Sequence, residues 1–315
     1  MRFYNIVITN PTDGTVIRQF TTLNALGLTN TGALNIELDI PTYAFAQPMG
    51  TAYIKIWGVA ITDISQAFNL NNANIQVYAG MSKGLPLANP KQANLILQGT
   101  VTEAYGNWQD VNQSIDMKVY PLNGTINSPA NIVLNWGAGT KLADAIAATL
   151  SVAYPGVKTN ININPSLVLS HNAPGYYQSI TQFAQYIKQI SQSIIGGTYQ
   201  GVDMSIRQNT IFVYDGTSST TPKQINFADL IGQVTWIAPQ TIQSRCILRG
   251  DVQVGDYVKM PPGQIGVTAQ TYSQYRNASL FQGVFRVIRV RHVGNFRQPD
   301  GNSWVTIIDA IPGNL

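Results

Sequence analysis

The sequence predicts a mainly β protein with a helical middle, an α+β arrangement, and three observations carry this prediction. Leu34–Ile40 alternates apolar and polar residues with a period of two, which is typical of a strand with one packed and one wet face. Thr140–Tyr154 and Ser179–Ile194 instead repeat apolar residues at helical spacing. From Ile225 the chain returns to β-branched and aromatic runs. Two β blocks are therefore expected to flank the helices.

The first block, residues 1–122, contains short apolar runs separated by regular turn signals, as in a barrel or a sandwich. Strands are expected at Met1–Ile8, Leu34–Ile40, Tyr53–Trp57, Asn74–Tyr78, Leu95–Glu103 and Gln113–Val119. Asp63 is expected to cap a short helix through Phe68, because its carboxylate would accept hydrogen bonds from the free amides of the first turn.

The middle, residues 123–222, is predicted to hold two helices. Pro155-Gly156 ends the first, and Ser179 with Gln182 forms a capping box at the start of the second. Gly196-Gly197 ends the second helix. Asn160–Asn172 is expected to be a loop with a short strand. Val202–Arg207 and Thr210–Tyr214 are expected to form a hairpin, and the polar connector Asp215–Pro222 marks a boundary.

The last block, residues 223–315, is organised around the stretch Gly250–Ala310. A first run, Gly250–Met260, ends at Pro261-Pro262-Gly263. Gly283–His292 and Trp304–Asp309 follow, separated by a loop through Pro299-Asp300-Gly301. These two long β-branched and aromatic runs predict antiparallel strands of a closed or nearly closed sheet.

The surface is predicted to be poor in charge. Charged residues make up 11% of the 315 residues, against roughly 25% in typical soluble proteins. Amides and hydroxyls replace them, which favours stable contacts with other chains over a free neutral surface of the extracellular type. The net charge is only +4. Arginines gather near the C-terminal end, and we interpret them as interface or strand-edge residues rather than as a nucleic-acid site: Arg276, Arg286, Arg289, Arg291 and Arg297.

No catalytic, cofactor or metal site is predicted. The two histidines, His171 in a loop and His292 at a strand end, lack metal-ligand spacing and a nucleophile motif. The only glutamates, Glu37 and Glu103, are expected on solvated strand positions. Cys246 is expected in the core. No segment is long and apolar enough for a membrane span, and no signal peptide is expected, so folding in a cytosol is predicted.

The order of several motifs resembles baseplate hub proteins of contractile-tailed bacteriophages. At the N-terminal end these are Asn74–Gly80, the Pro/Asn loop Gly84–Pro90, Leu95–Val101 and Tyr105-Gly-Asn-Trp108. At the C-terminal end, Gly255-Asp256-Tyr-Val resembles the strand entry of that family. Phe285–Gly294 with Trp304-x-Thr306 resembles its last hairpin. The family often has Gly-Asp after the histidine of this hairpin, where this sequence has Gly294-Asn295.

The resemblance implies two tail-tube-like β-barrels flanking a smaller α/β insert, in a structural protein that is not an enzyme. It implies a homotrimer that joins a hexameric tail tube protein to a trimeric central spike protein within the baseplate. The tape-measure protein and DNA would pass through its channel, and the protein would reside in the virion after assembly in the host cytoplasm. Candidate interface or channel residues are Arg286, Arg289, Arg291, His292, Trp108 and Trp304. Alternation predicts that Arg286 and His292 point one way and Arg289 and Arg291 the other.

Two other functions stay open on the sequence. A tail tube subunit or tube initiator would need one barrel and no helical middle. A carbohydrate-binding β protein would use aromatic platforms, for which the scattered tryptophans, such as the candidate Trp108, supply material. An enzyme has no convergent set of titratable groups behind it.

Overall fold

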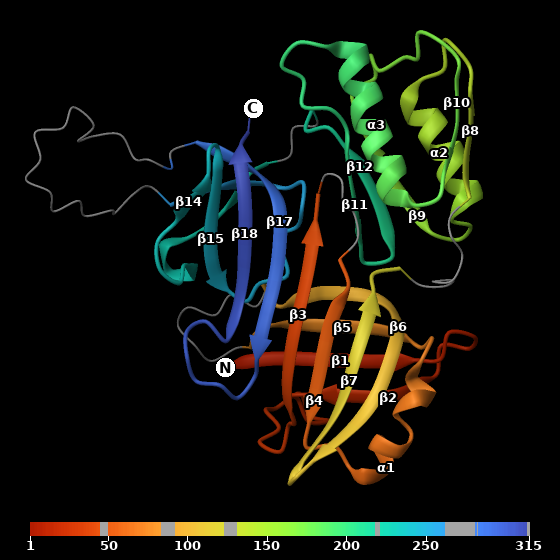
Figure 1. Ribbon diagram of the computed structural model, residues 1–315. Helices are drawn as coiled ribbons and strands as arrows, with labels where there is room; N and C mark the ends of the chain where they lie inside the picture. Colours follow the sequence, from red (N-terminus) through yellow and green to blue (C-terminus); the bar gives the residue numbers. More distant parts are fainter. Residues whose placement is uncertain are drawn as a thin grey trace, which may run out of the picture.

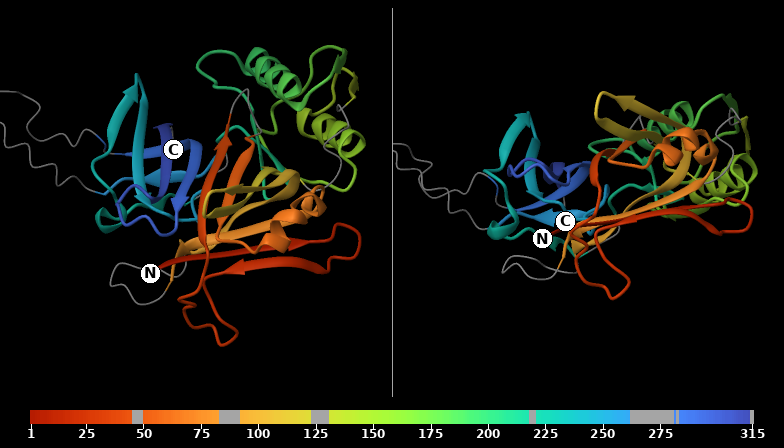
Figure 2. Two further views of the ribbon diagram at one scale, coloured as in Figure 1. Left: turned by 60° about the horizontal axis from the view of Figure 1, so that its bottom comes forward. Right: turned by 90° about the horizontal axis from the view of Figure 1, so that it is seen from below.

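The computed structural model describes residues 1–44, 50–82, 92–122, 131–217, 221–261, 281 and 283–313 (Figure 1). The mainly β prediction is confirmed. The Pro/Asn loop 84–90, the turn Pro262-Gly263 and Arg276 lie outside the described residues. We refer below to residues 1–122 as the N-terminal block, 131–217 as the middle region and 221–313 as the C-terminal block. Figure 2 shows these three parts side by side in two further views.

Strands of both blocks belong to one sheet of 13 strands. The N-terminal block contributes β1 (Arg2–Thr9), β2 (Val16–Thr21), β3 (Asn35–Tyr43), β4 (Ala52–Trp57), β5 (Asn74–Met81), β6 (Asn94–Gln109) and β7 (Asn112–Tyr120). The C-terminal block contributes β13 (Lys223–Gln224), β14 (Thr235–Ala238), β15 (Thr241–Ile247), β16 (Tyr257–Lys259), β17 (Val284–Asn295) and β18 (Trp304–Pro312). The main order is β14-β15-β18-β17-β3-β4-β7-β6-β5-β1-β2.

The two blocks meet edge to edge where β17 pairs antiparallel with β3. The register runs from Arg289 opposite Tyr43 to Asn295 opposite Glu37. Strand alternation then places Ile36, Leu38 and Ile40 in the N-terminal core, and Glu37 and Asp39 on the other face. Among the described residues this order does not close on itself, so the division into two barrels stays a prediction.

The middle region holds the two longest helices, α2 (Leu142–Ala153) and α3 (Ile180–Ile195). Its strands are β8 (Ile132–Trp136), β9 (Lys158–Asn162), β10 (Ala173–Tyr177), β11 (Asp203–Arg207) and β12 (Thr210–Tyr214). The Ser179 hydroxyl accepts a hydrogen bond from the Gln182 amide at 3.3 Å, and Gly196 ends α3 with a φ of 72°. In the β11–β12 hairpin, Gln208 and Asn209 both have positive φ, as a two-residue turn of type I′ requires.

Each part of the chain has its own hydrophobic cluster. One fills the N-terminal block, one lies under α2 and α3, and one fills the C-terminal block around Cys246. Trp304 belongs to the C-terminal block but packs in the hydrophobic cluster of the N-terminal block. Its indole Nε1 donates to the Gly80 carbonyl at 2.9 Å. None of the helices in the described residues is long and apolar enough to cross a membrane.

One local prediction is wrong. The short helix α1 (Ile61–Ser65) starts after Ala60 and has no side-chain cap. Asp63 lies inside its first turn, where it accepts from Arg18 Nε at 3.2 Å instead. In the run Gly250–Met260, residues Gly250–Asp256 form a loop and the strand β16 begins at Tyr257, directly after Gly255-Asp256. The 3₁₀ turns η1 (Ala67–Leu70) and η3 (Phe227–Asp229) also belong to the described residues.

Candidate assembly surface

One face of the sheet is polar across seven strands of both blocks, β15-β18-β17-β3-β4-β7-β6. Directly opposed residues of an antiparallel pair lie on the same face, so the registers define this surface, which we call the polar face. Its charged members are Arg245, Arg289, Arg291, Lys55 and Lys118 together with Asp309, Asp39, Glu37, Asp116 and Glu103. The face therefore carries five cations and five carboxylates, in addition to Arg286 on the same side of β17, which the middle region covers.

Ion pairs join neighbouring strands across this face. Arg291 holds Asp39 with two hydrogen bonds, from Nε at 2.7 Å and from Nη2 at 2.5 Å. Four pairs in all follow the sheet: Arg289–Asp309 at 3.6 Å, Arg291–Asp39 at 2.5 Å, Lys55–Asp116 at 3.4 Å and Lys118–Glu103 at 2.7 Å. The Arg291–Asp39 pair bridges the junction between the two blocks.

Asp116 is the most deeply buried carboxylate of the polar face. It accepts from the Tyr53 hydroxyl, from Asn107 Nδ2 at 2.8 Å and from Ser114 Oγ at 3.1 Å. Burial opposes its charge, but these hydrogen bonds and Lys55 outweigh that effect and hold the pKa of Asp116 below its usual value. Burial and the bond to Asp116 raise the pKa of Tyr53. Asp116 therefore stays charged and fixes the orientation of its neighbours.

Three of the residues predicted from the sequence as interface candidates lie inside the chain. Arg286, His292 and Trp304 are all buried. His292 is in the interior of β17 rather than at a strand end, with Nδ1 2.9 Å from the Thr306 hydroxyl. The chain itself therefore covers most of these three side chains. Arg289 and Arg291 are half-buried on the polar face, and Trp108 is exposed.

The predicted pairing of Arg286 with His292 on one face is also wrong. A β-bulge at Ile288 shifts the register between Val287 and Arg289, which moves Arg286 onto the same side as Arg289 and Arg291. The middle region covers it there. Arg286 donates to Asp203 Oδ2 at 3.1 Å and to Gln200 Oε1 at 2.7 Å.

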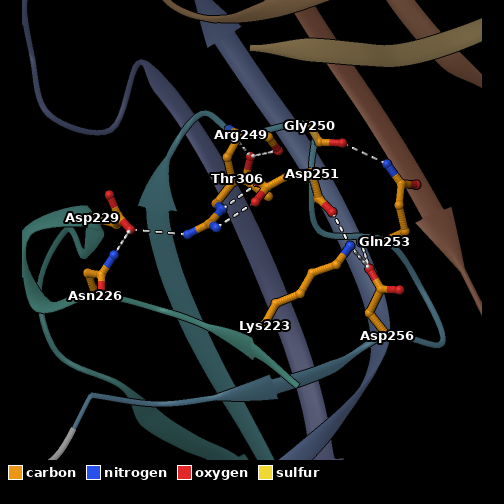
Figure 3. A network of polar contacts seen from close by, with 9 residues as sticks. All are labelled: Lys223, Asn226, Asp229, Arg249, Gly250, Asp251, Gln253, Asp256 and Thr306. Atoms are coloured by element: carbon orange, nitrogen blue, oxygen red, sulfur yellow. Dashed lines mark hydrogen bonds and ion pairs between the residues drawn. The ribbon is translucent and has the colours of Figure 1, made fainter. Parts of the chain in front are cut away.

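A buried network around Arg249 shapes the C-terminal block, and no sequence motif marks it (Figure 3). Arg249 donates twice to Asp251, at 2.8 and 2.7 Å, and once to Asp229 at 3.2 Å. The Thr306 hydroxyl lies between the Arg249 amide and carbonyl, at 2.9 and 3.1 Å.

The same network holds the loop of residues 250–256. Lys223 donates to the Asp256 carboxylate at 2.7 Å and to the Asp251 carbonyl. Asp256 also accepts from the Gln253 amide at 2.7 Å. Side chains thus pair with the Gln253 amide and with the Gly250 and Asp251 carbonyls, while the Gly250 and Gly255 amides donate to the Gln92 and Val287 carbonyls. These contacts satisfy backbone groups of the loop outside a strand ladder.

Apolar side chains are exposed at the edge strand β14. Trp236 and Ile237 are 45% and 50% exposed, and all four residues of β14 are exposed. On the N-terminal side of the sheet, the turn of the β6–β7 hairpin exposes Trp108 and Val111. An unprotected apolar edge strand is a place where another strand adds.

Residues that catalysis would need lie apart from one another. His171 is exposed in a loop with Nδ1 3.0 Å from the Ser170 hydroxyl, whereas His292 is buried. Cys246 is buried, and burial raises the pKa of its thiol to about 12. The described residues contain no group of three His, Cys, Asp or Glu that could hold a metal ion. Glu37 and Glu103 both lie on the polar face, engaged with Trp57 and Lys118.

Solved structures of phage tail proteins share this fold. The 43 kDa tail protein of prophage MuSo2 from Shewanella oneidensis matches with a TM-score of 0.56 at 7% identity, covering 100% of both chains. A tail protein from Neisseria meningitidis MC58 matches with a TM-score of 0.55 at 10% identity, over 99% of this chain and 96% of its own. No family model and no curated protein matches the sequence.

A third match is an E. coli component of the type VI secretion system with structural similarity to the T4 bacteriophage tail proteins gp27 and gp5. Its TM-score is 0.55 at 9% identity, over 90% of this chain and 75% of its own. The structural similarity of these three proteins shows the fold alone. The resemblance predicted from the sequence is confirmed at that level, and the chain has the fold of phage tail and baseplate proteins.

Proposed function

We propose that this chain is the structural baseplate hub of a contractile phage tail. The observation that carries the proposal is the β17–β3 junction, which joins two β blocks edge to edge in one sheet. Three chains with two such blocks each offer six blocks around an axis. A ring of this kind adapts a hexameric tail tube to a trimeric spike, because it presents six similar blocks on three chains.

The three hydrophobic clusters support the division into two β domains, 1–122 and 223–315, and a middle domain, 123–222. A tail tube subunit or tube initiator would need a single β block, so the second block favours the hub. A carbohydrate site would need a gathered aromatic platform. The exposed tryptophans Trp108 and Trp236 instead belong to different blocks.

Contacts between chains are assigned to two exposed apolar sites. The strand β14 lies beside β15, on one side of the seven-strand surface, and the hairpin turn with Trp108 belongs to β6 and β7, on its other side. Two different contact sites on opposite sides of a chain suit head-to-tail contacts between copies, and we assign to these contacts the closed ring of three chains. Of the arginines, Arg289 and Arg291 remain as channel candidates, since the polar face carries them.

The partners follow from this role. They are the tail tube protein on one side, the central spike and other baseplate proteins on the other, and the tape-measure protein and DNA within the channel. The protein acts in the virion, after assembly in the host cytoplasm. The likeness to a secretion-system component that itself resembles gp27 and gp5 supports such neighbours.

The test is the mass of the protein in solution and in tail particles, together with a low-resolution image. We expect a trimer that forms a three-fold ring with a six-fold-like inner face. A stable monomer inside an intact tail would contradict the proposal. So would a ring in which each chain contributes a single β block.

A further inference from the structure

A cleft of about 480 Å³ separates part of the middle region from the C-terminal block. One wall is formed by the loop after α3 and by the residues after β12, and the other by β16, β17 and the end of β18. In Figure 1, the loop after α3 and the end of β18 lie at the same end of the molecule. Clefts of this size between domains are common ligand sites, and the side chains around this one determine which ligand fits.

Arg286 contributes a buried cation to this cleft, with 4% of its surface exposed. Its Nη1 donates to Asp203 and its Nη2 to Gln200, and the described residues provide no other hydrogen-bond acceptor for it. A guanidinium carries five N–H donors, so three of them are unpaired. Unpaired donors of a buried charge are costly, and a ligand with acceptor atoms in the cleft would satisfy them.

Glycine keeps the cleft open beside this guanidinium. Gly216 has a φ of 79°, which other residues rarely adopt, and a Cβ there would lie 2.8 Å from the Tyr257 hydroxyl. The same Cβ would lie 3.7 Å from Arg286 Nη1. At Gly196 and Gly197, in the loop after α3, a Cβ would meet no atom outside the adjoining residues within 4 Å. The loop therefore leaves room for a ligand on the wall opposite the arginine.

Asp203 leaves a net positive charge beside the cleft. It pairs with two cations, since Lys188 Nζ lies 2.7 Å from Oδ1 and Arg286 Nη1 lies 3.1 Å from Oδ2. Gln200 adds donors without charge. Because a guanidinium only donates, the Gln200 oxygen faces Arg286, and Gln200 Nε2 has no acceptor among the described residues. The arginine and the amide together therefore present unpaired N–H groups to the cleft.

The carboxylate of Asp215 also lines the cleft, but its acceptor sites are occupied. Oδ1 accepts from the Thr217 amide and hydroxyl, at 3.0 and 2.6 Å. Oδ2 accepts from the Asn164 amide at 2.7 Å and from the Tyr199 hydroxyl at 2.8 Å. On the facing wall, burial raises the pKa of Tyr257, and the Arg286 charge, which lowers this pKa, outweighs the opposing charge of Asp215. The positive side of the cleft is therefore the side of the arginine.

We propose that this cleft binds an oxyanion, a carboxylate or a phosphate group, through Arg286 and Gln200. The oxygens of such a group accept the unpaired N–H bonds of both side chains, and hydrogen bonds to charged partners are shorter and stronger than neutral ones. Because the two walls belong to different parts of the chain, the bound group also ties the middle region to the C-terminal block. The inference does not depend on the proposed ring.

Calorimetric titration of the isolated full chain, at constant ionic strength, tests this site. Inorganic phosphate and succinate are the probes for a free ion, and the peptide acetyl-Gly-Asp-Gly-amide is the probe for a carboxylate carried by a protein segment. Succinamide and acetyl-Gly-Asn-Gly-amide are the uncharged controls. We expect one oxyanion to bind per chain, and the probe that binds most tightly identifies its source. Absence of binding by all three anionic probes would overturn the inference, as would equal binding by the uncharged controls.

The variant Gln200→Glu changes one polar group of the cleft with little change of shape. Its carboxylate still accepts from Arg286, but it replaces the amide donor and repels an anion, so the affinity should fall by about tenfold or more. Gln185→Glu is the matched control, because Gln185 is exposed on α3 and does not line the cleft. The control should bind as the wild type does. A folded Gln200→Glu chain with unchanged affinity would contradict the proposal.

Arg286→Lys keeps the charge but removes the planar fork of the guanidinium, and it should weaken binding by about tenfold or more. Arg289→Lys, on the same strand, is its control and should leave binding unchanged. A thermal melt shows whether each variant is folded, and the exposed Gln200 supplies the decisive variant if Arg286→Lys is unfolded. Wild-type affinity in folded Arg286→Lys would refute the site. Failure of the ring is distinguishable, because it appears in the mass measurement alone.

Discussion

Asp39 and Arg291 meet across the β3–β17 junction, with Arg291 Nε 2.7 Å from one carboxylate oxygen and Nη2 2.5 Å from the other. The two residues are 252 positions apart in the chain. Their pairing shows that the N-terminal and C-terminal blocks share a single hydrogen-bonded surface. The strand ladder beneath them, from Arg289 to Asn295, supplies the main connection.

This ion pair should contribute little to stability. Asp39 and Arg291 are 38% and 39% exposed, and pairs of that kind are typically worth about 0.2–1 kcal/mol. A double-mutant cycle with Asp39→Asn and Arg291→Gln, followed by urea unfolding, should give a coupling energy in that range, and added salt should reduce it. A coupling energy above about 2 kcal/mol would contradict the prediction and would mean that the junction depends on the pair.

Arg249→Ala should be far more costly. The substitution leaves Asp229 buried and Asp251 partly buried without their partner, and breaking a buried pair costs about 3–5 kcal/mol. Arg245→Ala is the matched control, since Arg245 is exposed on the adjacent strand β15 and should change stability by less than about 0.5 kcal/mol. Urea unfolding of both variants measures the difference. Similar losses for the two would show that the network around Arg249 does not hold the C-terminal block.

Much of the fold was predictable because it depends on local periodicity. The capping box at Ser179, the hairpin at residues 203–214 and the β17–β18 pair all follow from residues that are near one another in the sequence. Alternation also placed Glu37 and Asp39 on the wet face of β3 correctly. Periodicity does not show which strands are neighbours. It therefore could not predict that β3 pairs with β17.

The candidate site was less predictable for the same reason. The sequence predicts Arg291 as a candidate residue, but its pairing with Asp39 depends on the strand order. One inserted residue, Ile288, reversed the side of Arg286 relative to His292. The strand also continues past His292 through Gly294, where a Cβ would meet the Trp304 ring at 2.7 Å. The glycine permits this close approach, and His292 is therefore interior rather than terminal.

His292 should make stability depend on pH. Burial lowers the pKa of His292 to about 4 from 6.5, so the imidazole is neutral in the folded chain. The unfolded chain binds a proton at higher pH than the folded chain does. The stability associated with neutral His292 is therefore complete above pH 6.5 and is lost as the pH falls toward 4. That shift corresponds to about 3 kcal/mol at 1.36 kcal/mol per unit.

The measurement compares the free energy of unfolding of the wild type and of His292→Gln from pH 7 to pH 4. Carboxylates titrate in both proteins, and the exposed His171 is present in both, so the difference isolates His292. The stability of the wild type should fall more steeply than that of the variant over this interval. Parallel curves would mean that His292 has the same proton affinity in the folded and unfolded chains.

The edge strand β14 supplies the last prediction, which tests the proposed trimer at one position. Trp236 and Ile237 expose apolar surface on β14, which pairs on one side only among the described residues, and a lysine there deters strand addition. Ile237→Lys should shift the protein from trimer to monomer in sedimentation, with little change in unfolding. Val152→Lys, on the exposed face of α2, adds the same charge away from the sheet and should leave the trimer intact. A trimer that survives Ile237→Lys would assign the contact between chains to another surface.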